Sequence, residues 1–184
     1  MTADRSADLV VDASAAVAMV AGEQRGRWIA DVIGTCRRSG AEILVPNHFW
    51  LEVVNALAIG YGASAATVVE AIAELDATGI ETVAMDRPHV LLVIDTIDRH
   101  RLTAYDSAYL VLAETADAGL LTLDARLAAA AGDRATRLEG GHSIGEAEAP
   151  YEAPADRATL VAWPGAVAYL RELRARLRTP NVDI

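Results

Sequence analysis

Lysine is missing from this sequence, and all 16 basic side chains among its 184 residues are arginines. The 26 acidic residues outnumber them and give a formal net charge of -10 at pH 7. Proteins that bind nucleic acids usually present a basic surface, because Lys and Arg neutralise the phosphates. The overall charge therefore does not favour nucleic-acid binding, and any such function must depend on local groups of arginines.

Cysteine occurs once, at Cys36, which excludes an internal disulfide and any C-x-x-C metal or redox motif. This usage is typical of a reducing cytoplasm. The first residues carry Asp4 and Asp8 against only Arg5, so the basic region of a signal peptide is lacking. The apolar run at residues 13–21 is too short to cross a bilayer. Together these absences predict a cytoplasmic protein.

Hydrophobic residues make up 53% of the chain, whose length suits one sizeable core but not two ordinary domains. Short apolar segments alternate with segments of helical pattern, and Asn47 and Ser64 are the expected N-caps of two of these helices. The alternation predicts an α/β fold with a mostly parallel sheet covered by helices. The sheet has four or five strands, expected near residues 8–12, 42–46, 80–84, 119–124 and, as the fifth, 135–138.

The composition changes after Leu138. Residues 139–163 are rich in Gly, Pro, Ala and Glu and are typical of a linker. Residues 164–184 are expected to form a C-terminal helical extension that carries Arg171, Arg174, Arg176 and Arg178. The chain is thus divided into a folded domain at 1–138, a linker-like segment and this extension.

Four acidic residues stand out because each is the only full charge in an apolar segment: Asp12, Glu52, Asp106 and Asp124. Asp12 and Asp124 end predicted strands, Asp106 lies in the first turn of a predicted helix, and Glu52 lies in the second turn of another. In an open α/β sheet, functional groups gather beyond the carboxyl ends of the strands, so we expect the four carboxylates to converge there. Their mutual repulsion would raise their pKa values. A divalent cation such as Mg²⁺ or Mn²⁺, which prefers oxygen ligands, would relieve this repulsion.

Each aspartate also has an ordinary structural alternative. Asp12 and Asp124 have the position of helix N-caps, and Asp106 has capping-box spacing from Thr103. Glu52 does not fit this alternative, because it lies too far inside its predicted helix to cap it. An N-cap can also be a metal ligand, so the two roles are not exclusive.

Four sequence blocks carry these acids: VVDASA, VPNHFWLEVVNALA, LTAYDSAYLVLA and LLTLDARLAAAA. In order and spacing they resemble the signature blocks of the PIN-domain ribonucleases, most closely the VapC toxins of bacterial toxin–antitoxin pairs. The resemblance covers residues 9–138 and implies a three-layer α/β/α sandwich that acts as a Mg²⁺- or Mn²⁺-dependent endoribonuclease. It also implies a homodimer that a VapB-type antitoxin inhibits. The extension beyond Leu138 is longer than is usual for this compact family, and the resemblance says nothing of its role.

The four family acids fall on Asp12, Glu52, Asp106 and Asp124, and these positions show no departure from the pattern. We expect the three aspartates to hold one metal ion or two, while Glu52 binds a second ion or orients the attacking water. Supporting hydroxyls are expected at Ser14 and Thr122 to fix carboxylate rotamers, although an ordinary turn or cap bond explains them equally well. His48 lies one helical turn before Glu52 and is a candidate neighbour.

Two other functions compete with this interpretation. A phosphatase of the haloacid type needs a second Asp two residues after the first, but Ser14 stands there, and no lysine exists for its phosphate site. A PIN-like module that binds RNA or a partner without cutting is disfavoured because all four acids are present. Which RNA is cut stays open, and its contacts would fall to arginines, for which the candidates are Arg25, Arg27, Arg37, Arg38, Arg99, Arg101 and Arg126.

Overall fold

A computed structural model describes residues 8–136. Its sheet has four parallel strands in the order β3-β2-β1-β4, formed by β1 (Leu9–Val11), β2 (Ile43–Pro46), β3 (Ile80–Val83) and β4 (Gly119–Leu121). The predicted parallel α/β sheet is confirmed. Of the fifth strand expected at 135–138, the described part contributes one parallel bridge between Leu120 and Ala135.

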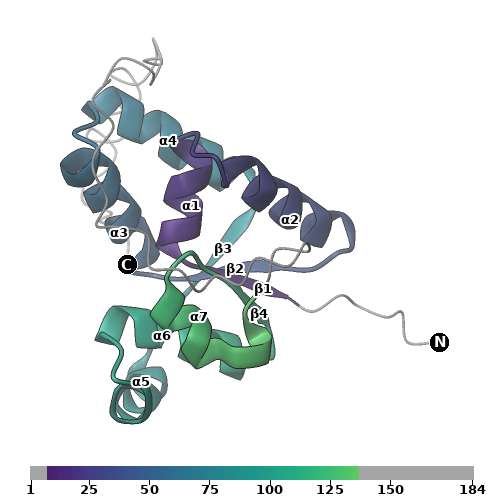
Figure 1. Cartoon of the computed structure of the whole chain (residues 1–184), viewed down its shortest axis with the longest axis vertical. Helices are drawn as coiled ribbons and strands as arrows, with labels where there is room; N and C mark the ends of the chain where they lie inside the picture. The colour runs from purple at the N-terminus through teal and green to yellow at the C-terminus, as the bar shows by residue number, and fades with distance from the viewer. Residues whose placement is uncertain (1–7, 137–184) are drawn as a thin grey trace, which may run out of the picture.

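Helices cover both faces of this sheet and give the predicted three-layer architecture (Figure 1). The chain steps from β1 to β2 to β3 in one direction, and right-handed crossovers therefore place the first helices on one face. The step back to β4, beyond β1, places the later helices on the other face. The first layer contains α1 (Ala13–Val20), α2 (Gly26–Arg38), α3 (Phe49–Asn55) with the π-helical turn Ala56–Gly60, and α4 (Ala65–Ala77). The second contains α5 (Arg87–His100), α6 (Ala104–Thr115) and α7 (Ala125–Ala131), followed by the 3-10 turn Gly132–Arg134.

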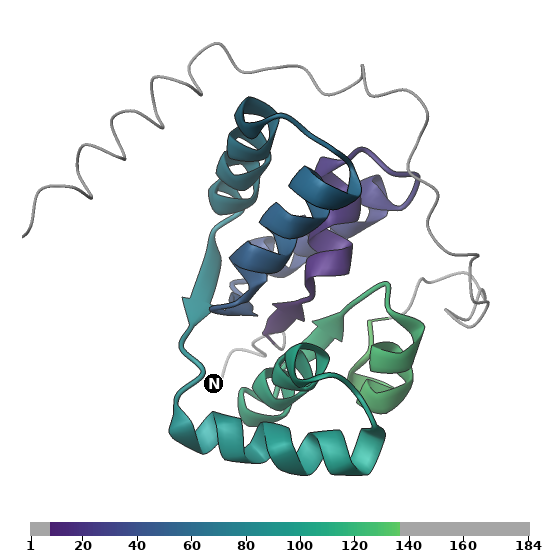
Figure 2. The same cartoon turned by 90° about the vertical axis from the view of Figure 1, so that its left-hand side faces the viewer.

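The core lies between the central strands and their covering helices. All residues of β1 and β2 are buried, as expected for parallel strands covered on both faces. In the second layer, α6 packs across β1, β2 and β4, and seven of its twelve residues are buried. Its neighbour α5 packs chiefly against α6 and forms the outermost element of that layer (Figure 2). The run that contains Asp106 is therefore apolar because its helix spans the centre of the sheet.

Of the two helix N-caps predicted from the sequence, one is confirmed and the other is wrong. Ser64 caps α4 as predicted, since its side chain accepts a hydrogen bond from the N–H of Thr67. The prediction for Asn47 is wrong, because α3 begins one residue later with His48 at the N-cap position. The N–H of Asn47 instead donates to the carbonyl of Val83 and extends the pairing of β2 with β3.

The linker-like segment at 139–163 and the helical extension at 164–184, with its four arginines, lie outside the described residues. Among the helices of residues 8–136, none has the length and apolar character needed to span a bilayer.

Candidate metal centre

The sheet has a topological switch point at the carboxyl ends of β1 and β4, where the chain leaves β1 toward β2 on one side and returns to β4 on the other. This is the position at which open α/β sheets place functional groups. The register pairs Val11 with Leu121, so the residues that follow them, Asp12 and Thr122, come together. The N–H of Asp12 donates to the carbonyl of Leu121 at 2.9 Å, which fixes this end of the two strands.

The carboxylate of Asp12 is held by the two hydroxyls that the sequence singled out. Ser14 Oγ donates to its Oδ2 at 2.5 Å, and Thr122 Oγ1 donates to the same oxygen at 2.8 Å. Ser14 Oγ in turn accepts the N–H of Leu123 at 3.0 Å, so both strand ends share the network. Although Asp12 occupies the N-cap position of α1, its side chain makes no capping hydrogen bond. The structural alternative for Asp12 is therefore wrong.

Burial raises the pKa of Asp12 to about 6, although the hydrogen bonds from Ser14 and Thr122 act in the opposite direction. The negative charges of Glu52 and Asp106 add to the increase. Three of the four carboxylates are thus close enough to repel one another, as the sequence predicts. Such a group is costly to keep ionised without a compensating positive charge.

Glu52 projects from α3 and is half-buried. Its Oε2 accepts a hydrogen bond of 2.6 Å from the hydroxyl of Tyr109, and the Nε2 atom of His48 lies 3.4 Å from the same oxygen. Burial raises the pKa of Glu52, and the charge of Asp106 contributes to this increase. Burial, together with the charges of Asp12 and Glu52, raises the pKa of Tyr109 above its usual range, so the phenol stays protonated.

His48 lies beside Glu52, where the sequence placed it as a candidate neighbour. Its ring contacts the rings of Tyr105 and Tyr109, with centroids 5.4 Å and 5.1 Å apart. Burial lowers the pKa of His48, so the ring is neutral at pH 7. The involvement of Tyr109 was missed, and the available signal was a polar-tipped aromatic residue one helical turn after Asp106.

The other two aspartates lie at helix N-termini. Thr103 caps α6, since its Oγ1 accepts the N–H of Asp106, and the same hydroxyl donates to Asp106 Oδ2 at 2.7 Å. This is one half of a capping box, in which the Asp106 carboxylate holds the hydroxyl of the cap and not a helix N–H. Asp124 Oδ1 accepts the N–H groups that begin α7, those of Arg126 and Leu127. Asp124 is also joined to the centre through its own N–H, which donates to Thr122 Oγ1 at 2.9 Å.

The four carboxylates share one feature. Within the described part of the chain, the hydrogen bonds that hold each of them fall on a single oxygen: Oδ2 of Asp12, Oε2 of Glu52, Oδ2 of Asp106 and Oδ1 of Asp124. The second oxygen of each carboxylate is thus the one that a cation or water can take. Oxygen donors from one or two carboxylates, completed by water, are what Mg²⁺ usually binds.

These acids do not form a complete metal cage. Among residues 8–136, no group of three or more His, Cys, Asp or Glu side chains is arranged so that it could hold a metal ion. The structure brings Asp12, Glu52 and Asp106 into electrostatic contact and links Asp124 to them through Thr122. The donor chemistry fits a hard divalent cation, and metal binding by these residues stays a prediction.

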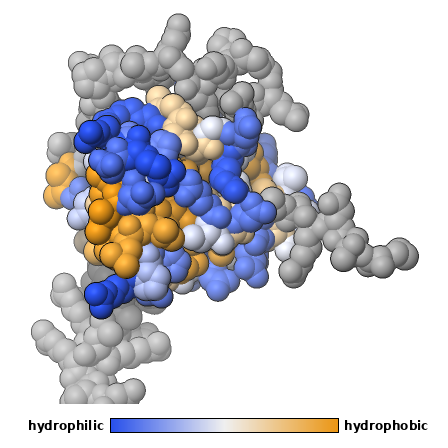
Figure 3. Space-filling view, turned by 90° about the horizontal axis from the view of Figure 1, so that it is seen from below, coloured by the Kyte–Doolittle hydropathy of each residue, from blue (hydrophilic) through white to orange (hydrophobic). Residues whose placement is uncertain are grey.

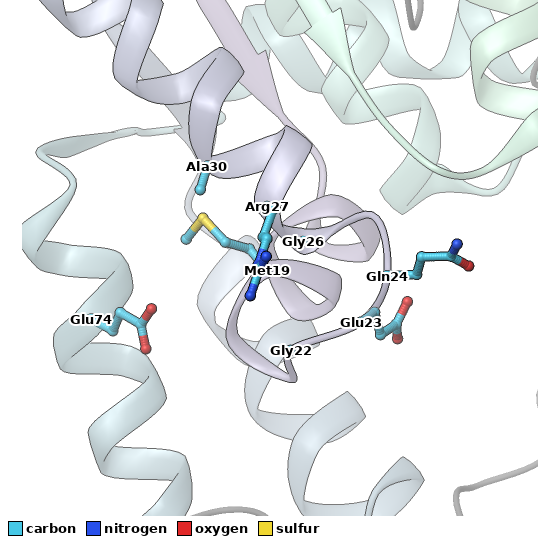
Figure 4. Close-up of a pocket in the computed structure, with 8 residues that line it drawn as sticks. All are labelled: Met19, Gly22, Glu23, Gln24, Gly26, Arg27, Ala30 and Glu74. Atoms are coloured by element: carbon cyan, nitrogen blue, oxygen red, sulfur yellow. The ribbon is translucent and has the colours of Figure 1, made fainter.

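A separate hollow of about 580 Å³ lies between α1, α2 and α4. Figure 4 shows Glu74 of α4 on one side, Met19 and Arg27 in the middle, and Glu23 on the other side. None of the four acids lines it. Its lining has two acidic side chains against one arginine, so it lacks the positive charge that phosphate binding needs.

A PIN-domain family model matches residues 9–133. Among solved structures, PAE2754 from Pyrobaculum aerophilum is 22% identical, with a TM-score of 0.54 over 73% of this chain and 86% of its own. VapC20 (Rv2549c) of Mycobacterium tuberculosis, a Sarcin-Ricin loop cleaving toxin, is 20% identical, with a TM-score of 0.50 over 67% of this chain and 95% of its own. No curated protein sequence matches the chain. The two structures share the fold over most of their lengths.

Proposed function

Since the chain belongs to the PIN-domain family, whose members are in general divalent-metal-dependent nucleases, we propose that it is a Mg²⁺- or Mn²⁺-dependent endoribonuclease that hydrolyses RNA phosphodiester bonds. The observation that carries the proposal is the environment of Asp12. This buried carboxylate lies at the switch point of the sheet, is held by two hydroxyls, and is repelled by Glu52 and Asp106. A cation is the simplest compensation for that arrangement.

In this mechanism, Asp12, Asp106 and Asp124 would hold the ion through the carboxylate oxygens that the protein leaves open. The ion would lower the pKa of a water molecule and neutralise charge on the phosphoryl oxygens. Ser14 and Thr122 would keep Asp12 in one rotamer, as partners of metal ligands commonly do. Glu52, held by its Oε2, would orient the attacking water through Oε1 or bind a second ion. Water attacks directly, so no covalent enzyme intermediate forms.

Contacts to the RNA backbone would come from arginines at the edge of this centre. Arg126 follows Asp124 by two residues and donates to the carbonyl of Arg101 at 2.6 Å, which holds the turn before α6 in place. Arg99 is engaged by Asp95 at 2.9 Å. We therefore place phosphate contacts on Arg101 and Arg126, both exposed, ahead of the other candidate arginines.

We further propose that the protein is the toxin of a type II toxin–antitoxin pair, acts in the cytoplasm and is inhibited by a VapB-like antitoxin. The supporting observations are the resemblance of its sequence blocks to VapC toxins and the fold shared with VapC20. The alternative is a PIN-like module that binds RNA or a partner without cutting it.

Cleavage of RNA by the purified chain tests the proposal. We expect cutting with Mn²⁺, none with excess EDTA, and a rate for Asp12→Ala lower by at least about 100-fold, because ligand loss removes the ion that activates water. Asp31→Ala, which removes an exposed carboxylate on α2, is the matched control and should cut normally. Cutting that persists in EDTA and in Asp12→Ala would contradict the proposal. RNA binding without cutting would favour the alternative.

We also propose that the chain forms a homodimer through α5. The face drawn in Figure 3 carries an apolar area over this helix, where Val90, Leu91, Leu92 and Ile94 are 46–59% exposed. Apolar patches of this kind mark interaction sites. A second copy fits because antiparallel pairing about a twofold axis would set this apolar face of one α5 against the same face of the other and remove both from water.

Introducing charge into this patch should separate the subunits. For Leu91→Glu with Ile94→Glu, we expect light scattering to give the monomer mass, because two buried carboxylates from each subunit would face those of the other across the axis. Ile59→Glu, at an apolar residue exposed to 77% outside α5, is the control and should remain dimeric. A monomeric wild type, or a variant that stays dimeric, would rule out this interface.

A further inference from the structure

Tyr109 is the largest fully buried side chain of the described residues, and its hydroxyl contacts one of the four acids, Glu52. The hydroxyl donates to Glu52 Oε2 at 2.6 Å, and the charges of Asp12 and Glu52 both contribute to its raised pKa. Tyr109 lies one helical turn after Asp106. Its hydroxyl thus joins α6, the helix that carries Asp106, to Glu52 on α3, and it lies near enough to Asp12 to respond to the charge of that carboxylate.

The bond to Glu52 restrains a side chain that would otherwise move. Glu52 has three rotatable bonds, and its side chain is 30% exposed. Tyr109 binds only Oε2, and the ring of His48 packs edge-on against Tyr109 while its Nε2 lies 3.4 Å from that same oxygen. A phenylalanine would fill the core equally well, so the hydroxyl matters through its hydrogen bond to Glu52.

From this geometry we infer that Tyr109 is a positioning residue of the metal centre, which holds Glu52 at a fixed place relative to Asp12 so that Oε1 faces the ion or water. The inference rests on the proposed function. It assigns Tyr109 no direct contact with substrate. Its effect passes through Glu52, and removal of the hydroxyl should therefore weaken ion binding and slow turnover without changing RNA affinity.

Tyr109→Phe tests this with two measurements. We expect the Kd for Mn²⁺, measured by calorimetry without RNA, to rise about 10- to 100-fold, as is usual when a partner of a metal ligand is removed. We expect kcat to fall by a similar factor while KM stays within about twofold. Tyr61→Phe is the matched control, since Tyr61 donates a hydrogen bond to Glu23 in an exposed position, and it should leave both quantities unchanged. A Tyr109→Phe protein with wild-type Kd and kcat overturns the inference.

A double-mutant cycle shows whether Tyr109 acts through Glu52. In a Glu52→Ala background, Tyr109→Phe should change the Kd for Mn²⁺ by no more than about twofold, because the group that it positions is gone. An equal loss in both backgrounds means that Tyr109 acts by another route and overturns the inference.

Replacing Tyr109 by para-aminophenylalanine retains the ring and a weaker para N–H donor, and should restore most of the ion affinity lost in Tyr109→Phe. If Tyr109→Phe does not fold, this replacement should still bind Mn²⁺ more weakly than wild type, and wild-type affinity then overturns the inference. A wild type that neither binds Mn²⁺ nor cuts RNA refutes the proposed function itself. A wild type that does both, beside an unaffected Tyr109→Phe, refutes only the role of Tyr109.

Discussion

The free energy of unfolding of Asp12→Asn is expected to exceed that of the wild type by up to about 3 kcal/mol at neutral pH without metal. The variant should also lose RNA cleavage. The pKa of Asp12 rises from 3.8 to about 6 in the folded protein, mainly through burial. Each pKa unit corresponds to about 1.4 kcal/mol of free energy. Asparagine removes the buried charge, and its Oδ1 can still accept hydrogen bonds from Ser14 and Thr122.

The difference in stability between Asp12→Asn and the wild type should depend on pH. The folded state binds the Asp12 proton more tightly than the unfolded state does. The protonated Asp12 therefore contributes fully to the free energy of unfolding below about pH 4, and this contribution is lost as the pH rises through about 6. Urea unfolding in EDTA should thus show no advantage of Asp12→Asn at pH 4 and the full advantage at pH 7.5. Asp31→Asn, at an exposed site, should show none at either pH. A variant less stable than wild type at pH 7.5 would contradict the burial argument.

The positions of the acids could be predicted because they depend on the ends of regular elements. Asp12 follows a run of three buried residues, and a parallel register then sets Thr122 beside it. Periodicity alone identifies such strands and helices, and strand ends of one sheet meet at one edge. For this reason the fold and the association of Asp12, Glu52 and Asp106 followed from the sequence.

Other features depend on side-chain direction, which spacing does not determine. Asp12 and Asp124 have the same position before a helix, yet only Asp124 caps its helix, because Asp12 is turned toward Ser14 and Thr122 across the strand ends. Tyr109 has the pattern of an ordinary core residue, and its hydroxyl becomes significant only when α3 is placed against α6. The failure of Asn47 as a cap has the same origin, since its N–H is used by the neighbouring strand β3.

Divalent-metal affinity should fall steeply with acid. We expect the Kd for Mn²⁺ to rise about tenfold between pH 7.5 and pH 5, because the ion binds the ionised carboxylate and must displace a proton from Asp12, whose pKa is about 6. Glu52, whose pKa is also raised by burial, makes the dependence steeper. Calorimetry at pH 6 in buffers of different ionisation heat should detect release of at least about half a proton per ion. A Kd independent of pH over this range would exclude Asp12 as a ligand.

The same ion should also remove most of the difference in stability between the two proteins. Without metal, the wild type carries the cost of an ionised, desolvated Asp12 that repels Glu52 and Asp106. With Mn²⁺ at 100 times its Kd, binding to the folded state adds about 2.7 kcal/mol, and it does so only where the ligands are intact. Melting curves at pH 7.5 should therefore show Asp12→Asn gaining little from Mn²⁺ while the wild type gains most of the stability that the buried charge removed. A uniform gain in both proteins would mean that the ion binds elsewhere, and the acids at the switch point would then need another explanation for their shared burial and repulsion.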